Sequence, residues 1–168
     1  MNRLLSAALA VLTVTACSSE AWSRTARHKC DVNSWVNERL ENWKQKLASS
    51  NPGNPGPIVG TYDRTHGTLL PTCANGPLTG DIEITKYFKD FLDLRPVVTE
   101  FKKTKVGGVC GNAFASGLYT FRLDGRQGAT LQARFTYVFQ GDVANAPIMQ
   151  HHSSLEPKTP GQQCPAAP

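Results

Sequence analysis

The stretch that decides the fold runs from Ala113 to Leu155 and holds three long segments of β character. Their sequences are AFASGLYTFRL (113–123), TLQARFTYVFQ (130–140) and IMQHHSSL (148–155). Each is rich in aromatic, β-branched and other apolar residues, and turn-forming residues separate one from the next. We therefore predict three consecutive strands of one antiparallel sheet. We also expect a functional site there, because polar and charged residues interrupt the apolar segments, among them Arg122, Arg134, His151 and His152.

Two amphipathic helices are predicted before these strands. Apolar residues recur at spacings of three and four from Val32 to Leu47, and Asp31 is a suitable N-cap. The second helix should run from about residue 81 to 94, where Pro96 prevents its continuation. A short strand (68–72), a loop (74–80) and a further strand (97–106) complete the pattern. Helices followed by antiparallel strands predict an α+β fold in which the sheet curls around the first helix.

Length and charge narrow the class of protein. With 168 residues, 40% hydrophobic and 18% charged, the chain has room for one domain with a core, which we place at residues 30–156. The formal charge of +5 falls to +4 if Arg3 is removed with a leader. The basic residues are scattered, with only Lys102, Lys103 and Lys105 close together. This predicts a solvated strand face and no nucleic-acid partner.

The N-terminus predicts export. Arg3 precedes an apolar segment, residues 4–16, that is too short to span a bilayer, and we interpret residues 1–16 as a signal peptide. The segment ends in Val14-Thr15-Ala16-Cys17, which resembles the bacterial lipobox. We therefore predict lipidation of Cys17, a tether over residues 17–29 and anchoring to a membrane in the periplasm or at the cell surface. Ordinary cleavage and secretion is the alternative. Residues 157–168 form a Pro-rich tail.

Four cysteines remain beyond Cys17, and in an exported protein an even number indicates disulfides. Three pairings are open, and sequence alone does not choose among them. We favour Cys73 with Cys110, which would join two loops, and Cys30 with Cys164, which would fasten the tail to the first helix. No Cys-x-x-Cys spacing occurs, so we predict no metal site.

Several short segments together resemble bacterial proteins related to the association domain of calcium/calmodulin-dependent protein kinase II, in the nuclear-transport-factor-2-like (cystatin-like) superfamily. The matching segments are LLPT (69–72), ITKYFKDFL (84–92), GLYTF (117–121), ARFTYV (133–138) and HHSS (151–154). Their order and spacing cover about residues 32–157. The resemblance implies a cone-shaped fold, with a long helix across a strongly curved, mainly antiparallel sheet and a pocket between them.

The resemblance also implies a ligand and a partner. The kinase's association domain is an oligomerising hub whose pocket holds arginines and a histidine and accepts small carboxylates. On this sequence Arg134 matches one pocket arginine and His152 lies near the matching histidine. Ser153 and Tyr119, or Thr120, stand where arginines are expected.

The residues themselves place Arg134 on a strand with two partly apolar faces. Its strand neighbours on one face include Thr136, and the other face carries Phe135 and Tyr137. We expect the Arg134 face to line the pocket and the other face to meet a partner subunit. The alternative is a surface arginine on a half-solvated strand. His151 and His152 must point to opposite faces, and we expect His152 to face Arg134. The alternative for a histidine is satisfaction by a nearby hydroxyl.

We therefore predict ligand-binding residues Arg134, His152, Tyr119, His151 and Thr136, which would take a small organic anion such as a carboxylate, with no cofactor. The favoured function is an exported, non-catalytic binding or assembly domain that forms a homodimer through the outer sheet face. One alternative is an extracytoplasmic isomerase-, cyclase- or hydrolase-like enzyme using the same pocket, with its carboxylate sought among Asp63, Asp93 and Glu100. Another alternative is a lipoprotein that acts through protein contacts.

Overall fold

The computed structural model describes residues 30–72 and 74–156. The predicted signal peptide, Cys17 with its tether and the tail lie outside these ranges. The helices are α1 (Val32–Ala48), α2 (Gly56–Val59), α3 (Gly80–Asp93) and a 3-10 turn, η1 (Asp124–Arg126). The strands are β1 (Thr68–Leu70), β2 (Leu78–Thr79), β3 (Pro96–Val109), β4 (Asn112–Leu123), β5 (Ala129–Gln140) and β6 (Ile148–Leu155). Within the described ranges, no helix has both the length and the apolar character needed to cross a membrane.

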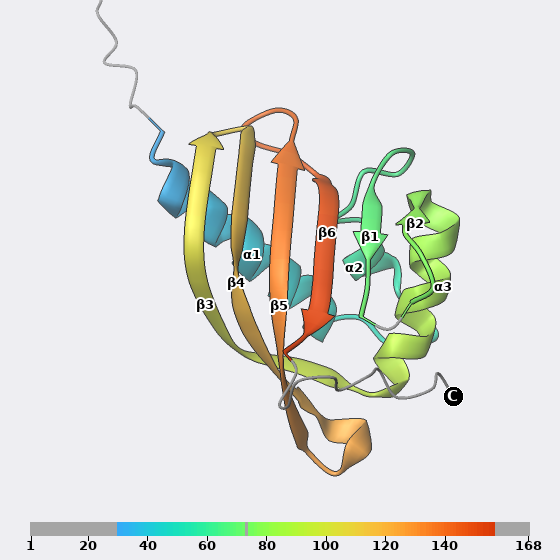
Figure 1. Cartoon of the computed structure of the whole chain (residues 1–168). Coiled ribbons are helices and arrows are strands. Elements are labelled where there is room, and N and C mark those ends of the chain that lie inside the picture. The colour runs from blue at the N-terminus through green and yellow to red at the C-terminus, as the bar shows by residue number, and fades with distance from the viewer. Residues whose placement is uncertain (1–29, 73, 157–168) are drawn as a thin grey trace, which may run out of the picture.

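The strands form one six-stranded sheet in the order β2-β1-β6-β5-β4-β3. Strands β3 to β6 pair antiparallel in succession, as predicted, and β1 adds to β6 in parallel. Helix α1 crosses behind β3, β4 and β5, while α2 and α3 lie toward β1 and β2 (Figure 1). We call the face that α1 covers the inner face and the opposite one the outer face. The predicted α+β fold, with a long first helix across a curved and mainly antiparallel sheet, is confirmed.

Local sequence explains where the helices begin. The Asp31 carboxylate accepts a hydrogen bond from the Asn33 backbone N–H at 3.0 Å and from the Ser34 hydroxyl at 2.8 Å, so Asp31 is the N-cap as predicted. Helix α3 begins at Gly80, in the segment predicted to be a loop. That segment also contributes the two-residue strand β2, which pairs with β1.

The core lies between α1 and the inner face. Five residues of α1 that follow the predicted spacing are buried: Trp35, Val36, Leu40, Trp43 and Leu47. The ring of Trp43 lies within 6.4 Å, centroid to centroid, of four rings from the sheet: Phe101, Tyr119, Tyr137 and His151. Such aromatic contacts bury large apolar areas and favour one arrangement of the helix on the sheet.

The disulfide prediction is wrong. Cys30 bonds to Cys110, with the two Cα atoms 6.2 Å apart. Cys110 lies in the turn between β3 and β4, at the end of the sheet where α1 begins. The predicted pairs Cys73–Cys110 and Cys30–Cys164 are therefore both excluded, and Cys73 and Cys164 lie outside the described residues. The observed bond fastens the start of α1 to the β3–β4 turn.

The first turns of α1 also hold the loop between β5 and β6. The indole N–H of Trp35 and the guanidinium of Arg39 each donate to the carbonyl of Val143 at 2.7 Å, and Arg39 donates to Ala144 at the same distance. The guanidinium carbon of Arg39 lies 5.0 Å from the centroid of the Trp35 ring, close enough for a cation–π contact. Two loops at one end of the sheet are thus attached to the same helix.

Candidate functional site

The alternation of side chains along β5 divides the predicted site between the two faces. Phe135 is 2% exposed and Tyr137 is fully buried, so both point inward, whereas Arg134 is exposed and Thr136 half-buried on the outer face. Successive strand residues point to opposite faces, so the two sets cannot mix. Helix α1 covers the face with the larger aromatic side chains. Arg134 therefore does not line the interior, and the alternative of a surface arginine is the one observed.

Strand β6 divides the two histidines in the same way. His151 is 3% exposed on the inner face, while His152 is exposed on the outer face. Tyr119, on β4, is buried on the inner face beside His151. The prediction that Arg134, Tyr119 and His152 surround one pocket is therefore wrong. The structure brings Tyr119 together with His151, and it places Arg134, Thr136 and His152 on the other side of the sheet.

On the inner face a chain of hydrogen bonds joins four aromatic side chains, which we call the inner group: Trp43, Tyr62, His151 and Tyr119. The indole N–H of Trp43 donates to the Tyr62 hydroxyl at 3.2 Å. The Tyr62 hydroxyl lies 2.7 Å from Nδ1 of His151, and Nε2 of His151 lies 3.3 Å from the Tyr119 hydroxyl. Neither Trp43 nor Tyr62 was predicted as a site residue, because they lie on α1 and after α2, far from the strands in sequence.

These contacts define the direction of each hydrogen bond. An indole can only donate, so Tyr62 accepts from Trp43 and has its own proton for Nδ1 of His151. Nε2 of His151 then carries the ring proton and donates to Tyr119. The reverse tautomer would leave the buried Tyr62 proton without an acceptor. His151 is thus satisfied by tyrosine hydroxyls, which is the alternative that the sequence left open for a histidine.

The inner group is electrically neutral. Burial, together with the nearby His152, lowers the pKa of His151 from its ordinary 6.5 to about 3, so the imidazole is uncharged at neutral pH. Burial raises the pKa of the Tyr119 hydroxyl far above its ordinary value, and a side-chain hydrogen bond with Ser153 partly offsets this rise. Burial likewise raises the pKa of Tyr62 and Tyr137. A neutral chain of this kind can donate and accept hydrogen bonds but offers no charge to an anion.

Tyr137 extends the inner group through its ring. The ring stacks on that of His151, with centroids 4.0 Å apart and planes 16° apart. Its hydroxyl oxygen is buried and has no hydrogen-bond partner among the described residues. Stacking therefore holds the imidazole from one side while hydroxyls hold both of its nitrogens.

Carboxylates and metal ligands are placed elsewhere. Asp63 accepts from the backbone N–H groups of Thr65 and His66 at 3.0 and 2.8 Å, and these two bonds lower its pKa. Asp93 and Glu100 are exposed. Among the residues that the structure describes, no Asp, Glu, Lys or Arg is buried, and His151 is the buried titratable residue other than the tyrosines. The same residues include no group of three His, Cys, Asp or Glu side chains that could hold a metal ion.

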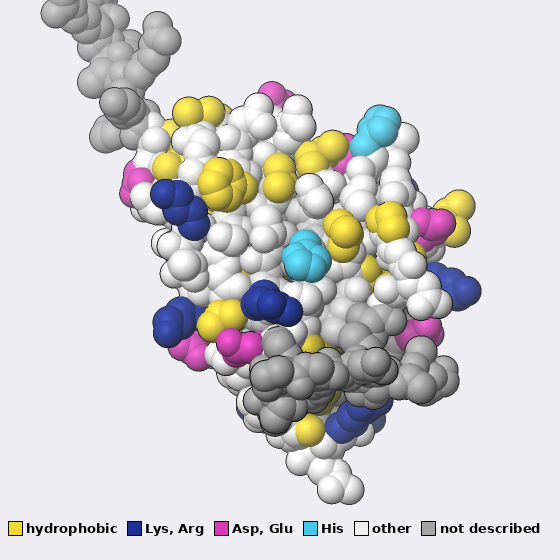
Figure 2. Space-filling model, viewed as in Figure 1, with side chains coloured by type: hydrophobic (Ala, Val, Ile, Leu, Met, Phe, Trp, Pro, Cys, Tyr) yellow, Lys and Arg dark blue, Asp and Glu magenta, His cyan; other side chains and the backbone are white. Residues whose placement is uncertain are grey.

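The outer face carries apolar and neutral polar side chains. Figure 2 looks onto it and shows hydrophobic side chains spread between uncharged ones, with Lys, Arg, Asp and Glu mainly toward its edges. Phe114 is 39% exposed, and Leu118, Val138 and Leu70 are half-buried. Arg134 is the charged residue nearest the middle, and its guanidinium donates to the Leu155 carbonyl at 3.0 Å.

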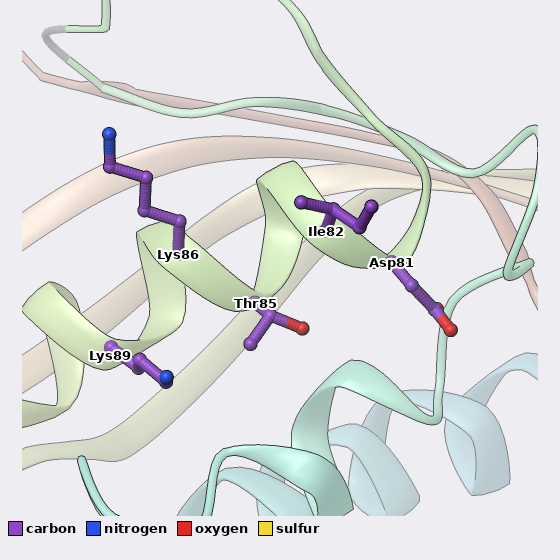
Figure 3. A pocket seen from close by; sticks show the side chains of 5 residues that line it. All are labelled: Asp81, Ile82, Thr85, Lys86 and Lys89. Carbon is purple, nitrogen blue, oxygen red and sulfur yellow. The ribbon is translucent and has the colours of Figure 1, made fainter.

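A shallow hollow lies outside the sheet, on α3. It is lined by Asp81, Ile82, Thr85, Lys86 and Lys89, all from one helix (Figure 3). The side chains of Lys86 and Lys89 extend in different directions, and the Asp81 carboxylate accepts from Arg64 at 2.7 Å. The two lysines therefore do not converge on one point where a ligand would bind.

Solved structures with the same arrangement of helices and sheet define the fold family. A Xanthomonas campestris protein, assigned as a calcium/calmodulin-dependent protein kinase II association domain, is 28% identical and has a TM-score of 0.65. The match covers 78% of this chain and 96% of that one. This chain has a nuclear-transport-factor-2-like, cystatin-like fold and resembles that association domain. The other solved structures are much less similar in sequence, so they inform on the fold of this chain and not on its chemistry.

Two of those relatives share the fold at much lower identity. A Nostoc punctiforme protein of unknown function with a cystatin-like fold is 13% identical, with a TM-score of 0.60, over 76% of this chain and 93% of that one. A Bacillus subtilis protein assigned as an isomerase is 12% identical, with a TM-score of 0.52, over 76% and 91%. No protein-family model and no curated protein sequence matches the chain.

Proposed function

We propose that this protein is an exported, non-catalytic assembly domain that forms a homodimer through the outer face of the sheet, whose central strands are β6 and β5. The observation that carries the proposal is the contrast between the two faces. The inner face is filled by the protein's own side chains, with Tyr137 and Tyr119 no more than 1% exposed. The outer face leaves Phe114 39% exposed, and Figure 1 shows none of the described helices lying over it.

The composition of the outer face suits a second copy of the same chain. Protein interfaces have an apolar or neutral centre, while charged residues are favoured at the rim. The neutral side chains of Ser116, Leu118 and Thr136 lie toward the centre, and the charged residues of the outer face on β3 lie at the sheet edge: Glu100, Lys102 and Lys105. A two-fold contact would place these neutral side chains against their own copies and leave the β3 charges at the periphery, with Arg134 as the charged residue nearest the contact.

The area is also sufficient. Strands spaced about 4.8 Å apart and rising about 3.3 Å per residue make a four-stranded face of 8 to 14 residues roughly 600 Å² in outline. Side chains add to this outline. Stable protein interfaces bury about 600–1,000 Å² on each partner, so an outline of this size lies at the lower end of that range.

Two further observations support assembly and export. The Xanthomonas campestris protein, to which this chain is 28% identical, is assigned as an association domain. The Cys30–Cys110 disulfide fits an oxidising compartment, as does the predicted signal peptide, so we include export and lipidation of Cys17 in the proposal. We do not include a small carboxylate ligand, because Arg134 points outward and His151 is neutral.

In the enzyme alternative, the active site would be the inner group around His151. Its chemistry would need a carboxylate or another base beside Tyr119 or His151. Asp63 follows Tyr62 in sequence, but its carboxylate accepts hydrogen bonds from the backbone of Thr65 and His66. The other two candidates, Asp93 and Glu100, are exposed. The inner group therefore supports a structural role for His151 better than a catalytic one.

Sedimentation equilibrium of the chain from Ser18 to Pro168 tests the proposal. We expect the wild type to be a dimer and Phe114→Glu to weaken dimerisation at least tenfold, because it places a charge on the apolar outer face. Ile82→Glu is the matched control, since Ile82 is 86% exposed on α3, away from this face. A monomeric wild type, or equal dimerisation of all three proteins, would contradict the proposal.

A further inference from the structure

The middle of the outer face is occupied by a histidine. In the strand order β2-β1-β6-β5-β4-β3, the strands β6 and β5 are central. His152 of β6 pairs in register with Thr136, which lies near the middle of β5. Ser116 of β4 and Leu70 of β1 complete this row on either side. His152 is exposed, unlike its neighbour His151.

A two-fold interface brings its central residues against their own copies. If the outer face pairs with itself about an axis near its middle, the two His152 side chains lie close to each other. Neutral imidazoles are compatible with such a contact because they can stack or hydrogen-bond. Two imidazolium ions would repel each other in a site from which the partner excludes water.

The charged groups around His152 cannot neutralise a proton there. On β5 the nearest charge is the positive Arg134, and β4 contributes Ser116 and Leu118 beside it. On β1 the neighbours are Thr68 and Leu70. Strand β3 carries Lys102, Lys105 and Glu100, three strands from β6, which is about 14 Å at a spacing of about 4.8 Å. Glu156 lies four residues beyond His152, just after β6 ends.

No ion pair is present that would neutralise a proton on His152 in the described residues. In the described part of the chain His152 forms no ion pair, and the salt bridges present involve Lys44, Arg64, His66 and Arg122. Protonation of His152 would therefore add a positive charge next to Arg134 on each of two facing surfaces. The free subunit can hydrate that charge, whereas the dimer must bury it.

We propose that His152 makes association through the outer face sensitive to pH, so that the dimer forms when His152 is neutral and dissociates when it is protonated. This inference rests on the proposed homodimer. Histidine changes charge between about pH 8 and pH 5, so the association constant should fall across that range. Because the free subunit binds the proton more tightly than the dimer does, acid favours the free subunit.

Sedimentation equilibrium at about pH 8 and about pH 5.5, on either side of the ordinary histidine range, tests the inference. We expect the dissociation constant of the wild type to rise about tenfold or more at the lower pH, from repulsion at short range. His152→Gln keeps a neutral polar side chain and should remain a dimer at both values. His66→Gln is the matched control, because His66 is an exposed histidine on the loop before β1 and should retain the wild-type response.

The possible results separate the two proposals. A dimer with the same dissociation constant at both pH values would overturn the role of His152 and leave the assembly proposal intact. If His152→Gln dissociated at low pH as much as the wild type, the effect would belong to another group. That result would also overturn the role of His152. A wild type that is monomeric at pH 8 would overturn both proposals. Circular dichroism at each pH confirms that the subunits stay folded.

Discussion

On β5, Phe135 and Tyr137 point toward α1, whereas Arg134 and Thr136, their immediate neighbours, point toward solvent. The inner side chains belong to an aromatic core in which His151 is neutral and held by tyrosine hydroxyls. The outer ones share a face with His152, Leu118 and Phe114. The two faces of β5 therefore contribute to different properties, and substitutions on them should affect different measurements. Inner substitutions should change folding stability, and outer ones should change association.

The largest contrast is expected between Trp43 and Phe114. Trp43→Ala should lower the free energy of unfolding by about 3–5 kcal/mol, because it leaves a cavity among four aromatic rings and removes the donor to Tyr62. Phe114→Ala on the outer face should cost about 1 kcal/mol or less, because the ring is partly exposed. Urea unfolding measures both values. Similar losses in the two variants would show that the outer face is part of the core.

Loss of the disulfide should have the next largest effect. Cys30 and Cys110 are 80 residues apart in sequence, so their bond restricts the unfolded chain strongly. Cys110→Ser should lower the free energy of unfolding by about 2–4 kcal/mol. Denaturant unfolding of the variant against the oxidised wild type measures this loss. If Cys110→Ser and the wild type have the same dimer dissociation constant when both are folded, the disulfide stabilises the subunit and does not affect association through the outer face.

Acid should destabilise the subunit through His151. The folded state holds the pKa of His151 at about 3, whereas the unfolded chain has the ordinary value of 6.5. The unfolded state therefore binds the proton first, and stability is lost as the pH falls from about 6.5 toward 3. The loss should reach about 2 kcal/mol at pH 5 relative to neutral pH.

The pH dependence of urea unfolding tests this effect. His151→Phe should flatten the dependence between pH 7.5 and pH 5, although the variant is less stable throughout because Tyr62 loses its acceptor. His152→Gln is the control from the outer face and should retain most of the wild-type dependence when both proteins are unfolded below the dimer dissociation constant, where association does not contribute. If His152→Gln flattened it instead, the assignment of the two histidines to opposite roles would be wrong.

Arg134 should contribute least to stability. Its guanidinium makes one hydrogen bond to a backbone carbonyl from an exposed position. Arg134→Ala should change the free energy of unfolding by about 0.5 kcal/mol or less. Thermal shift with small carboxylates extends the test to ligand binding. A stabilisation of the wild type that Arg134→Ala abolishes would show that an exposed arginine binds an anion, contrary to our proposal.

Much of the fold was predictable because its signals are local. The spacing from Val32 to Leu47 and the Asp31 cap define α1, and the turn residues between apolar segments separate β4, β5 and β6. The family resemblance was also predictable, because short segments occur in the right order. Strand β2 was missed because its two residues have no periodic pattern and depend on pairing with β1.

The candidate site was only partly predictable for a different reason. The alternation along β5 and β6 shows which residues share a face, so the separation of His151 from His152 follows from the sequence. It does not show which face a helix will cover when both carry apolar residues. Arg134 was therefore assigned to the wrong face. Tyr62 and Trp43 could not be connected to His151 until α1 and the segment after α2 were placed against the sheet.

By itself, the sequence determined the α+β class, the first helix, the three central strands and the likeness to an association domain, since each depends on neighbouring residues or on their order. Tertiary structure alone decided that α1 covers the Tyr137 face, that Cys30 meets Cys110, and that Tyr62 and Tyr119 hold His151. These contacts join residues 32 to 89 positions apart. No local pattern encodes such distances, because they are set by the way a helix and a curved sheet exclude water between them.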